Sequence, residues 1–233
     1  NNIPSEGGCI TVSNHPYQGI DSILLFKIIY DIRKDFKIMA SFILQNIGPL
    51  HDIILPINTF REAKGTKSSF SGIKEGILHL KNNNCLGIFP AREGSAYLEL
   101  PKVIIDNEWQ IPAIEFIKNA KVPVIPVYFH GTNSRLLYIV RKISPILKFT
   151  SLPAELQNKK NRIVKIRIGT AITVKEQSEF KDIAQYGRYL RARTYSLGSS
   201  LEAQRFFNKL SFRKKLPPEP LATPVAEDIL RND

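Results

Sequence analysis

The sequence predicts an α/β fold in which a mostly parallel central sheet is flanked by helices. Short runs rich in β-branched residues alternate along the chain with segments whose apolar residues recur at helical spacing. This alternation is typical of strand–helix–strand units, which build parallel sheets. The chain has 233 residues, of which 43% are hydrophobic, so it is long enough to enclose one sizeable core.

Each expected strand is a short apolar run bounded by turn residues. The first is Gly8 to Ser13, and another, Cys85 to Phe89, is stopped by Pro90. The run from Val122 to Phe129 contains two prolines, so we expect an edge or irregular strand there. The remaining expected strands are Phe36 to Ala40, Ile53 to Ile57 and Ile163 to Gly169.

Helices are expected where apolar residues recur every three or four positions. Asp21 opens one that runs to about Arg33, and Ser69 to Asn82 is a second that two asparagines end. The other expected helices are Ser41 to Asn46, Trp109 to Ala120, Phe180 to Leu197 and Leu201 to Phe212.

Composition divides the chain into a folded domain, residues 1–213, and a proline-rich tail or linker, residues 214–233. The sequence begins with Asn1 instead of Met, which we interpret as a trimmed start, and the tail is compatible with a further domain. No run of about 18 uninterrupted apolar residues occurs, so we expect no membrane-spanning helix.

The chain is strongly basic, with 33 Lys and Arg against 21 acidic residues and a net charge of +12. Such a charge favours polyanionic partners: nucleic acid, an anionic membrane face or an acidic carrier protein. Charge alone does not choose among these partners, and a solvated basic surface is a further interpretation.

The two cysteines, Cys9 and Cys85, both lie in apolar runs, so we expect buried free thiols and a reducing compartment. The histidines His51, His79 and His130 show no metal-ligand spacing with cysteines or carboxylates. We therefore expect no metal site, and each of these histidines is interpreted as an ordinary core or surface residue.

The segment from Asn14 to Asp21 carries the candidate chemistry, because it joins a buried strand to the start of a helix. Ligands of α/β proteins bind at such turns. His15 is a candidate proton acceptor there, and Asp21 can orient its ring if Pro16 to Gly19 fold back as a turn. The plainer alternative is that Asp21 caps the helix and His15 is a hydrogen-bonded turn residue.

These residues, SNHPYQGIDS, resemble the Asn-His…Asp block of the glycerolipid O-acyltransferase superfamily, which includes lysophosphatidic acid acyltransferases. The common spacing leaves four residues between His and Asp, whereas this chain has five. The longer spacing resembles the hemolysin-like or ornithine-lipid acyltransferase subgroup.

Further blocks resemble the same family in the expected order. FPAREGS, from Phe89 to Ser95, is similar to the family's FPEGTRS block, and Val122 to His130 is similar to its VPVIPV strand. Three later segments resemble the hemolysin-like subgroup: Leu152 to Lys160, Arg167 to Gln177 and Tyr186 to Gly198. The resemblance covers nearly the whole chain and implies a glycerolipid acyltransferase-like fold.

The resemblance implies that His15 and Asp21 are catalytic and that a set of nearby residues binds substrate. In an ungapped alignment Ala91 and Arg92 stand where the family has Glu and Gly, whereas a two-residue shift matches Glu93 and Gly94. Arg92 suits a phosphate or carboxylate, or else an ion pair with a neighbouring glutamate. The implied substrate-binding residues are Asn14, Gly19, Arg61, Phe89, Pro90, Arg92, Glu93, Gly94 and Ser95.

The implied reaction moves a fatty acyl group from a thioester, acyl-CoA or acyl-carrier protein, to the hydroxyl of a lyso-lipid, with no other cofactor. The acceptor stays open among lysophosphatidic acid, lyso-ornithine lipid and related lyso-aminolipids. The implied place is the cytoplasmic face of the membrane, as a peripheral protein on an anionic surface, without nucleic acid. The alternatives are a non-catalytic basic lipid- or nucleic-acid-binding module and a thioester or ester hydrolase.

Overall fold

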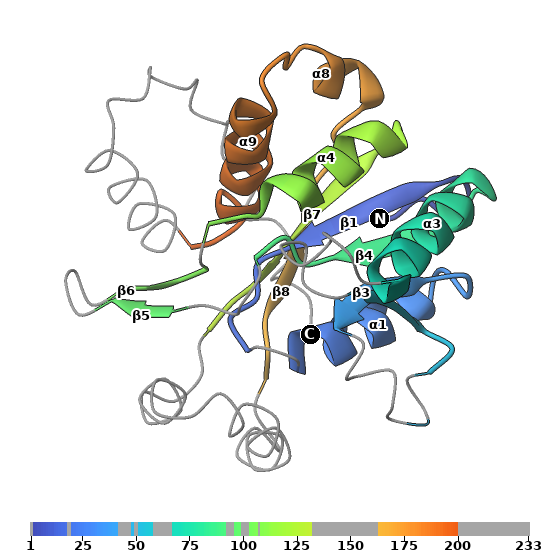
Figure 1. Cartoon of the computed structure of the whole chain (residues 1–233). Coiled ribbons are helices and arrows are strands. Elements are labelled where there is room, and N and C mark those ends of the chain that lie inside the picture. Colours follow the sequence, from blue (N-terminus) through green and yellow to red (C-terminus); the bar gives the residue numbers. More distant parts are fainter. Residues whose placement is uncertain are drawn as a thin grey trace.

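The structure is a computed structural model, and it describes residues 2–17, 20–41, 48, 51–57, 67–91, 96–98, 103–106, 108–131 and 163–199. Within these residues the main sheet has six strands in the order β3-β2-β4-β1-β7-β8 (Figure 1). They are β1 (Cys9–Ser13), β2 (Lys37–Ser41), β3 (Ile54–Ile57), β4 (Cys85–Ile88), β7 (Val124–Phe129) and β8 (Ile166–Ile168). Neighbouring strands are parallel except β7 with β8, so the predicted α/β class with a mostly parallel sheet is confirmed.

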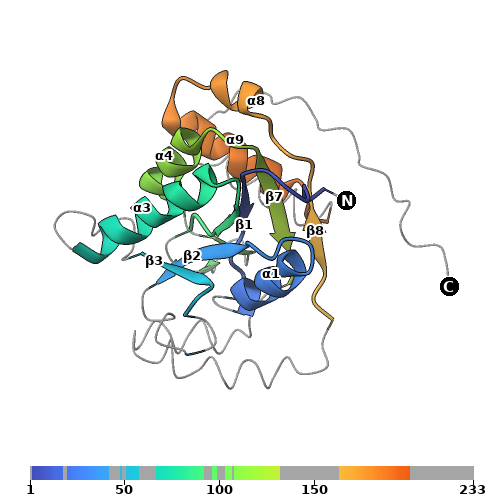
Figure 2. The same ribbon diagram turned by 90° about the vertical axis from the view of Figure 1, so that its right-hand side faces the viewer.

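Helices cover both faces of this sheet (Figure 2). They are α1 (Ile20–Tyr30), α3 (Lys67–Lys81), α4 (Ile111–Ala120), α8 (Val174–Ser178) and α9 (Ile183–Tyr195). Leu25 of α1 belongs to one buried cluster, and Ile114 of α4 and Leu190 of α9 belong to the other. β1 is buried along its whole length because its side chains enter the two clusters in turn, Cys9 on the α1 side and Ile10 on the other.

Among the described residues, every helix is too short or too polar to form a membrane span.

The strand that contains two prolines lies inside the sheet. An edge or irregular strand was expected over Val122 to Phe129. β7 stands between β1 and β8, so the edge position is wrong. Pro126 is tolerated because its backbone faces the end of β8, where its carbonyl oxygen accepts the Gly169 N–H at 2.8 Å. Gly169 also leaves room for the proline ring, since a Cβ built there would lie 2.9 Å from Pro126 Cγ.

The other strands and helices predicted over described residues occur with shifted ends, and two features were missed. α1 ends at Tyr30 instead of Arg33. The helix α8 was missed although Thr173 and Glu176 form a capping box at its start, a pattern visible in the sequence. The antiparallel pair of β5 (Ala96–Leu98) and β6 (Val103–Ile105) was missed because three-residue strands give little periodicity.

Several expectations fall on residues that the structure does not describe. Ser41 is the last residue of β2, and the rest of the helix expected at Ser41 to Asn46 lies outside the described residues. The helix expected at Leu201 to Phe212, the tail 214–233 and the domain boundary before it also lie outside them.

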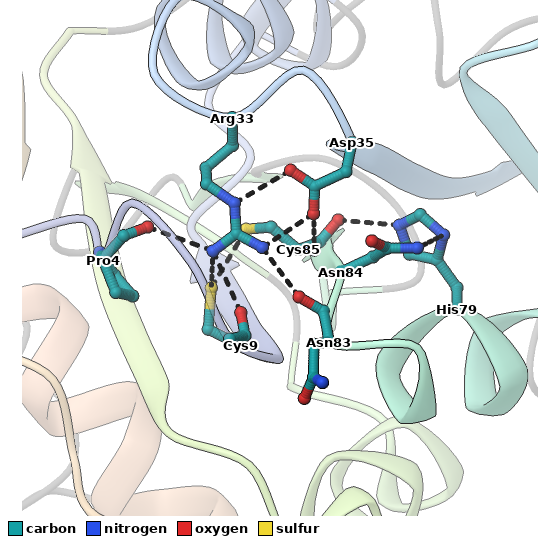
Figure 3. Close-up of polar contacts among 9 residues, drawn as sticks. Pro4, Cys9, Arg33, Asp35, His79, Asn83, Asn84 and Cys85 are labelled. Atoms are coloured by element: carbon teal, nitrogen blue, oxygen red, sulfur yellow. Dashed lines mark hydrogen bonds and ion pairs between the residues drawn. The ribbon is translucent and has the colours of Figure 1, made fainter.

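A buried arginine joins three segments at the amino-terminal ends of β1 and β4 (Figure 3). The Arg33 side chain is 3% exposed, and its Nε and Nη2 donate to the two carboxylate oxygens of Asp35 at 2.8 and 2.7 Å. Its Nη1 also donates to the carbonyl oxygens of Pro4 and Gly7, and its Nη2 donates to that of Asn83. The guanidinium therefore ties the segment before β1 to the chain that follows α1 and to the turn before β4.

Asp35 extends this arrangement to the sheet, because its Oδ2 accepts the Cys85 N–H at 2.7 Å where β4 begins. The hydrogen bonds from Arg33 hold the pKa of the Asp35 carboxyl below its ordinary value. A lowered folded-state pKa means that the carboxylate stabilises the fold at pH values above its ordinary pKa. That contribution is lost as the pH falls through the lowered value.

Cys9 and Cys85 stand opposite each other in the β1–β4 pair. Both are buried free thiols, as predicted, and a hydrogen bond joins their sulfur atoms at 3.2 Å. The hydrogen bond with Cys9 and burial together raise the pKa of the Cys85 thiol, so this thiol keeps its proton.

We expect Arg33→Met to lower the free energy of unfolding by about 3–5 kcal/mol, because it leaves Asp35 and three carbonyl oxygens without their buried donor. Urea unfolding followed by circular dichroism measures the change. The control is Lys34→Met, which removes the same charge from an exposed neighbour stacked on Tyr30 and should cost less than about 1 kcal/mol. Equal losses in the two variants would contradict the account.

We expect wild-type stability to fall more steeply than that of Asp35→Asn between about pH 6 and pH 3, because only the wild type protonates a carboxylate that Arg33 holds. Urea midpoints measured across this range for both proteins give the comparison. Parallel pH curves would show that the Arg33–Asp35 contact makes no pH-dependent contribution.

Candidate active site

Three strand ends place the candidate residues side by side. β1 runs parallel to β4 on one side and to β7 on the other, so the carboxyl ends of these strands meet at one edge of the sheet. After β1 the chain passes to α1 on one face, and after β4 it continues to α4 on the opposite face. In open α/β sheets, ligands bind in the crevice where connections leave adjacent strands toward opposite faces.

Asn14 fastens the segment after β1 to the end of β7. Its Nδ2 donates to the Phe129 carbonyl oxygen at 3.0 Å, and its Oδ1 accepts the Phe129 N–H at 2.7 Å. The Asn14 side chain is buried, and its two polar atoms pair with the backbone N–H and C=O of Phe129 as the backbone of another residue would. Asn14 therefore fixes the point from which His15 leaves the sheet.

His15 and Asp21 meet across the turn that separates them. His15 Nδ1 lies 2.8 Å from Asp21 Oδ1, with the imidazole 17% exposed and the carboxylate fully buried. The carboxylate also accepts the backbone N–H groups of Tyr17 and Ser22 at 3.0 Å each. Asp21 is thus more than the helix cap of the plainer interpretation: it belongs to the first turn of α1, where the helix dipole favours a negative charge, and it binds the ring of His15.

This contact selects the tautomer of the His15 ring. An ionised carboxylate can only accept, so in the neutral ring the proton sits on Nδ1, and Nε2 presents its lone pair. A ring held in this way can take a proton at Nε2, while Asp21 stabilises the imidazolium that results.

Phe89, the first residue after β4, lies against the same imidazole. The two ring centroids are 4.6 Å apart, with an angle of 41° between the planes. Pro90 follows and is buried, and its carbonyl oxygen accepts the Gln110 N–H at 3.0 Å before α4 begins. Phe89, which the sequence resemblance implies is a substrate-binding residue, thus lies against the His15 ring, and Pro90 is the residue after it.

Tyr17 joins the segment that follows β1 to the chain after β7. Its hydroxyl donates to the His130 carbonyl oxygen at 2.6 Å, just after β7. Gly131, the next residue, has a φ of +99°, and a Cβ built there would lie 2.2 Å from the Tyr17 hydroxyl oxygen. Glycine is required at this position both for its backbone conformation and for the close approach of the tyrosine.

Sequence reasoning missed Asp106, which binds the backbone of His15. Both carboxylate oxygens of Asp106 accept the His15 N–H, each at 3.0 Å, and the side chain is 1% exposed. An acidic residue that directly follows an apolar run, as in VIID, was the available signal, but the 91 positions between the partners hide the contact.

Two residues of α9 hold Asp106 in turn. The Tyr195 hydroxyl accepts the Asp106 N–H at 3.0 Å, and Arg191 Nη2 donates to the Asp106 carbonyl oxygen at 2.7 Å. Arg191 is half-buried and points toward Asp106. Arg193 instead donates to the Thr170 hydroxyl at the surface.

The other histidines lie in ordinary surroundings. His79 Nε2 contacts the Cys85 carbonyl oxygen at 3.0 Å, and burial lowers its pKa. His51 is 65% exposed and pairs with the adjacent Asp52 at 3.2 Å. Within the described part of the chain, no three side chains of the His, Cys, Asp and Glu types are grouped as metal ligands.

The structure thus brings the side chains of His15, Asp21 and Phe89 together just after Asn14, and Pro90 directly follows Phe89. The remaining predicted substrate-binding residues lie outside the described residues: Gly19, Arg61, Arg92, Glu93, Gly94 and Ser95.

Comparison with known proteins decides the family. The sequence profile described as "Acyltransferase" matches residues 2–204. The chain belongs to the acyltransferase family. Two curated relatives of this acyltransferase are named lyso-glycine lipid O-acyltransferase. The one from Bacteroides thetaiotaomicron is 28% identical over 84% of this chain and 72% of its own length, and the one from Phocaeicola vulgatus is 25% identical over 84% and 70%.

A solved structure supports the fold of this acyltransferase. The crystal structure of PlsC, the 1-acyl-sn-glycerophosphate acyltransferase of Thermotoga maritima, superposes with a TM-score of 0.50. It is 17% identical in sequence, and the match covers 92% of this chain and 71% of PlsC. Together, these comparisons confirm the resemblance to the glycerolipid acyltransferase superfamily.

We expect Asn14→Ala to lower the free energy of unfolding by about 2–3 kcal/mol, because it leaves the buried N–H and C=O of Phe129 without their partner. Chemical unfolding measures the loss. The control is Asn2→Ala, which removes an exposed hydrogen bond from the Asn2 side-chain amide to the Ile168 carbonyl oxygen and should change stability by less than about 0.5 kcal/mol. A neutral Asn14→Ala would mean that the amide does not anchor the turn.

Proposed function

We propose that this acyltransferase moves a fatty acyl group from an acyl thioester to the hydroxyl of a lyso-lipid, with His15 as the general base. The observation that carries the proposal is the 2.8 Å contact between His15 Nδ1 and Asp21 Oδ1, beside the carboxyl ends of β1 and β4. The family match supports the reaction class.

The chemistry needs one proton acceptor and no covalent acyl-enzyme. His15 Nε2 takes the proton of the acceptor hydroxyl as its oxygen attacks the thioester carbonyl carbon. Asp21 stabilises the imidazolium while the tetrahedral intermediate exists. When the carbon–sulfur bond breaks, the imidazolium returns the proton to the departing thiolate, so the products are the O-acyl lipid and a free thiol.

The proposed acceptor is a lyso-aminolipid, and a lyso-glycine lipid is the first one to test. The names of both curated relatives support this choice. Lysophosphatidic acid and lyso-ornithine lipid, which the sequence resemblance implies, are the comparison acceptors. Arg92 and Arg61 are proposed to bind the acceptor headgroup, since a guanidinium suits phosphate and carboxylate groups.

The proposed place of action is the membrane surface, because an acceptor with a long acyl chain resides in the bilayer. The net charge of +12 supports attraction to an anionic lipid surface. Acyl-CoA and acyl-carrier protein are the two proposed donors, and a basic protein suits the acidic carrier as well.

Two other functions are less well supported. A non-catalytic basic lipid- or nucleic-acid-binding module does not require a histidine within hydrogen-bond distance of a buried carboxylate, and this chain has one. A thioester hydrolase needs the same His15–Asp21 pair, so only the product distinguishes it: free fatty acid instead of O-acyl lipid.

We expect His15→Ala to lower the rate of acyl transfer by roughly 10²–10⁴-fold, because it removes the general base. The assay gives purified protein labelled acyl-CoA or acyl-carrier protein and each of the three lyso-lipids, and quantifies O-acyl lipid and free fatty acid by mass spectrometry. Asp21→Asn should also lower the rate, because the amide cannot stabilise the imidazolium in the same way.

The matched control is His51→Ala, because His51 also contacts an aspartate through Nδ1 but lies exposed on the surface. Its rate should equal that of the wild type. Full activity in His15→Ala would refute the proposed mechanism, and fatty acid release without lipid acylation would indicate the hydrolase.

A further inference from the structure

We propose that Asp106 is a positioning residue for the reaction, which fixes the backbone of His15 while Asp21 fixes its ring. The inference rests on the proposed role of His15 as the general base. It adds a residue that the His…Asp motif does not contain, from a segment 91 positions along the chain.

The two carboxylates approach His15 from different directions. Asp21 approaches the imidazole at Nδ1, from the helix that follows the turn. Asp106 approaches the main-chain N–H, from the segment after β6. Two carboxylates from different segments therefore restrain one residue at its two ends, the backbone and the ring.

Asp106 binds His15 through both of its carboxylate oxygens. Both of them contact the same N–H, each at 3.0 Å, just past the end of β1 where the sheet no longer supplies a partner. A hydrogen bond to an ionised acceptor is stronger than one between neutral groups. Both oxygens of the carboxylate thus bind the backbone of His15, which is the contact that a positioning role requires.

Asp106 is itself held in place by two residues of α9. Tyr195 and Arg191 are four residues apart on α9, so they lie on one face of that helix and reach the two backbone polar groups of Asp106. Burial and the Asp106 charge raise the pKa of Tyr195 well above its ordinary value, so the phenol stays neutral. Arg191 thus binds the main-chain oxygen of Asp106 while Tyr195 binds its N–H, so both backbone polar groups of Asp106 are held by α9.

The consequence is that α9 contributes to catalysis without touching the substrate. Its side chains hold Asp106, Asp106 holds the His15 backbone, and the ring keeps its place relative to the acceptor hydroxyl. A displacement of about 1 Å in a reacting group can cost on the order of 10²-fold in rate. Loss of Asp106 should therefore lower kcat while leaving the binding of the acceptor nearly unchanged.

The test variant is Asp106→Asn, which keeps the size of the side chain but turns an amide NH₂ toward the His15 N–H in place of one oxygen. We expect kcat for acyl transfer to fall by about 10- to 100-fold and KM for the lyso-lipid to stay within about threefold. Glu115→Gln makes the same chemical change at an exposed position of α4 and should keep the wild-type kcat.

A double-mutant cycle separates positioning from a merely structural role. If Asp106 acts through His15, adding Asp106→Asn to His15→Ala should leave the residual rate unchanged. A structural defect would lower the residual rate by the same factor as in the wild type. Should Asp106→Asn fail to fold, Tyr195→Phe removes the hydroxyl that accepts the Asp106 N–H. That variant should lower kcat by about 3- to 10-fold with the same non-additivity.

Wild-type kcat in the soluble Asp106→Asn protein, or in Tyr195→Phe when the first variant does not fold, would overturn the inference. So would equal effects of either variant with and without His15. These outcomes leave the proposed function intact if His15→Ala alone is inactive. Full activity in His15→Ala would instead remove the general base, and with it the role of Asp106.

Discussion

The structure around the candidate site depends on one contact, between the His15 ring and the fully buried carboxylate of Asp21. A buried charge is costly unless hydrogen bonds compensate it, and here the N–H groups of Tyr17 and Ser22 and the first turn of α1 do so. The same groups fold the chain back after β1, so the bonds that stabilise the carboxylate also bring it to the imidazole. The contacts that fold this turn are therefore the same contacts that hold the His15 ring in place for catalysis.

The sheet separates this arrangement from a second polar cluster. The segment with His15 lies at the carboxyl ends of β1, β4 and β7. Arg33 and Asp35, which follow α1, lie against the amino-terminal ends of β1 and β4 (Figure 3). Arg33 is buried and bonded on every side, which suits a group that stabilises the fold. The imidazole of His15 keeps partial exposure, which suits a group that must meet a substrate. The parallel strands between them keep the two clusters at opposite edges.

The sequence predicted features that depend on neighbouring residues. The buried strand before Asn14, the fold-back from His15 to Asp21 and the helix after it all follow from local patterns, and the structure contains them. The prediction failed for β7. A proline argues against an interior strand only where its missing N–H would have to donate to the neighbouring strand. Pro126 faces Gly169, where an acceptor is enough, and that pairing is set by a segment 43 positions later.

Asp106 could not be predicted for a related reason. Its contact with His15 joins segments 91 residues apart, and its own partners lie on α9, a further 85 and 89 positions along the chain. One sequence carries no signal that relates these four residues. Their proximity depends on the order of the strands in the sheet. β1, which precedes His15, lies between β4 and β7, and the segments that contain Asp106 and α9 follow these two strands in the chain.

The most direct test of the central claim is the position of the proton on the His15 ring. Nitrogen NMR of protein labelled at histidine, recorded at about pH 8, distinguishes the two ring nitrogens. The account predicts that His15 carries its proton on Nδ1 and that Asp21→Asn abolishes this preference. A proton on Nε2, or an unchanged tautomer in Asp21→Asn, would contradict it.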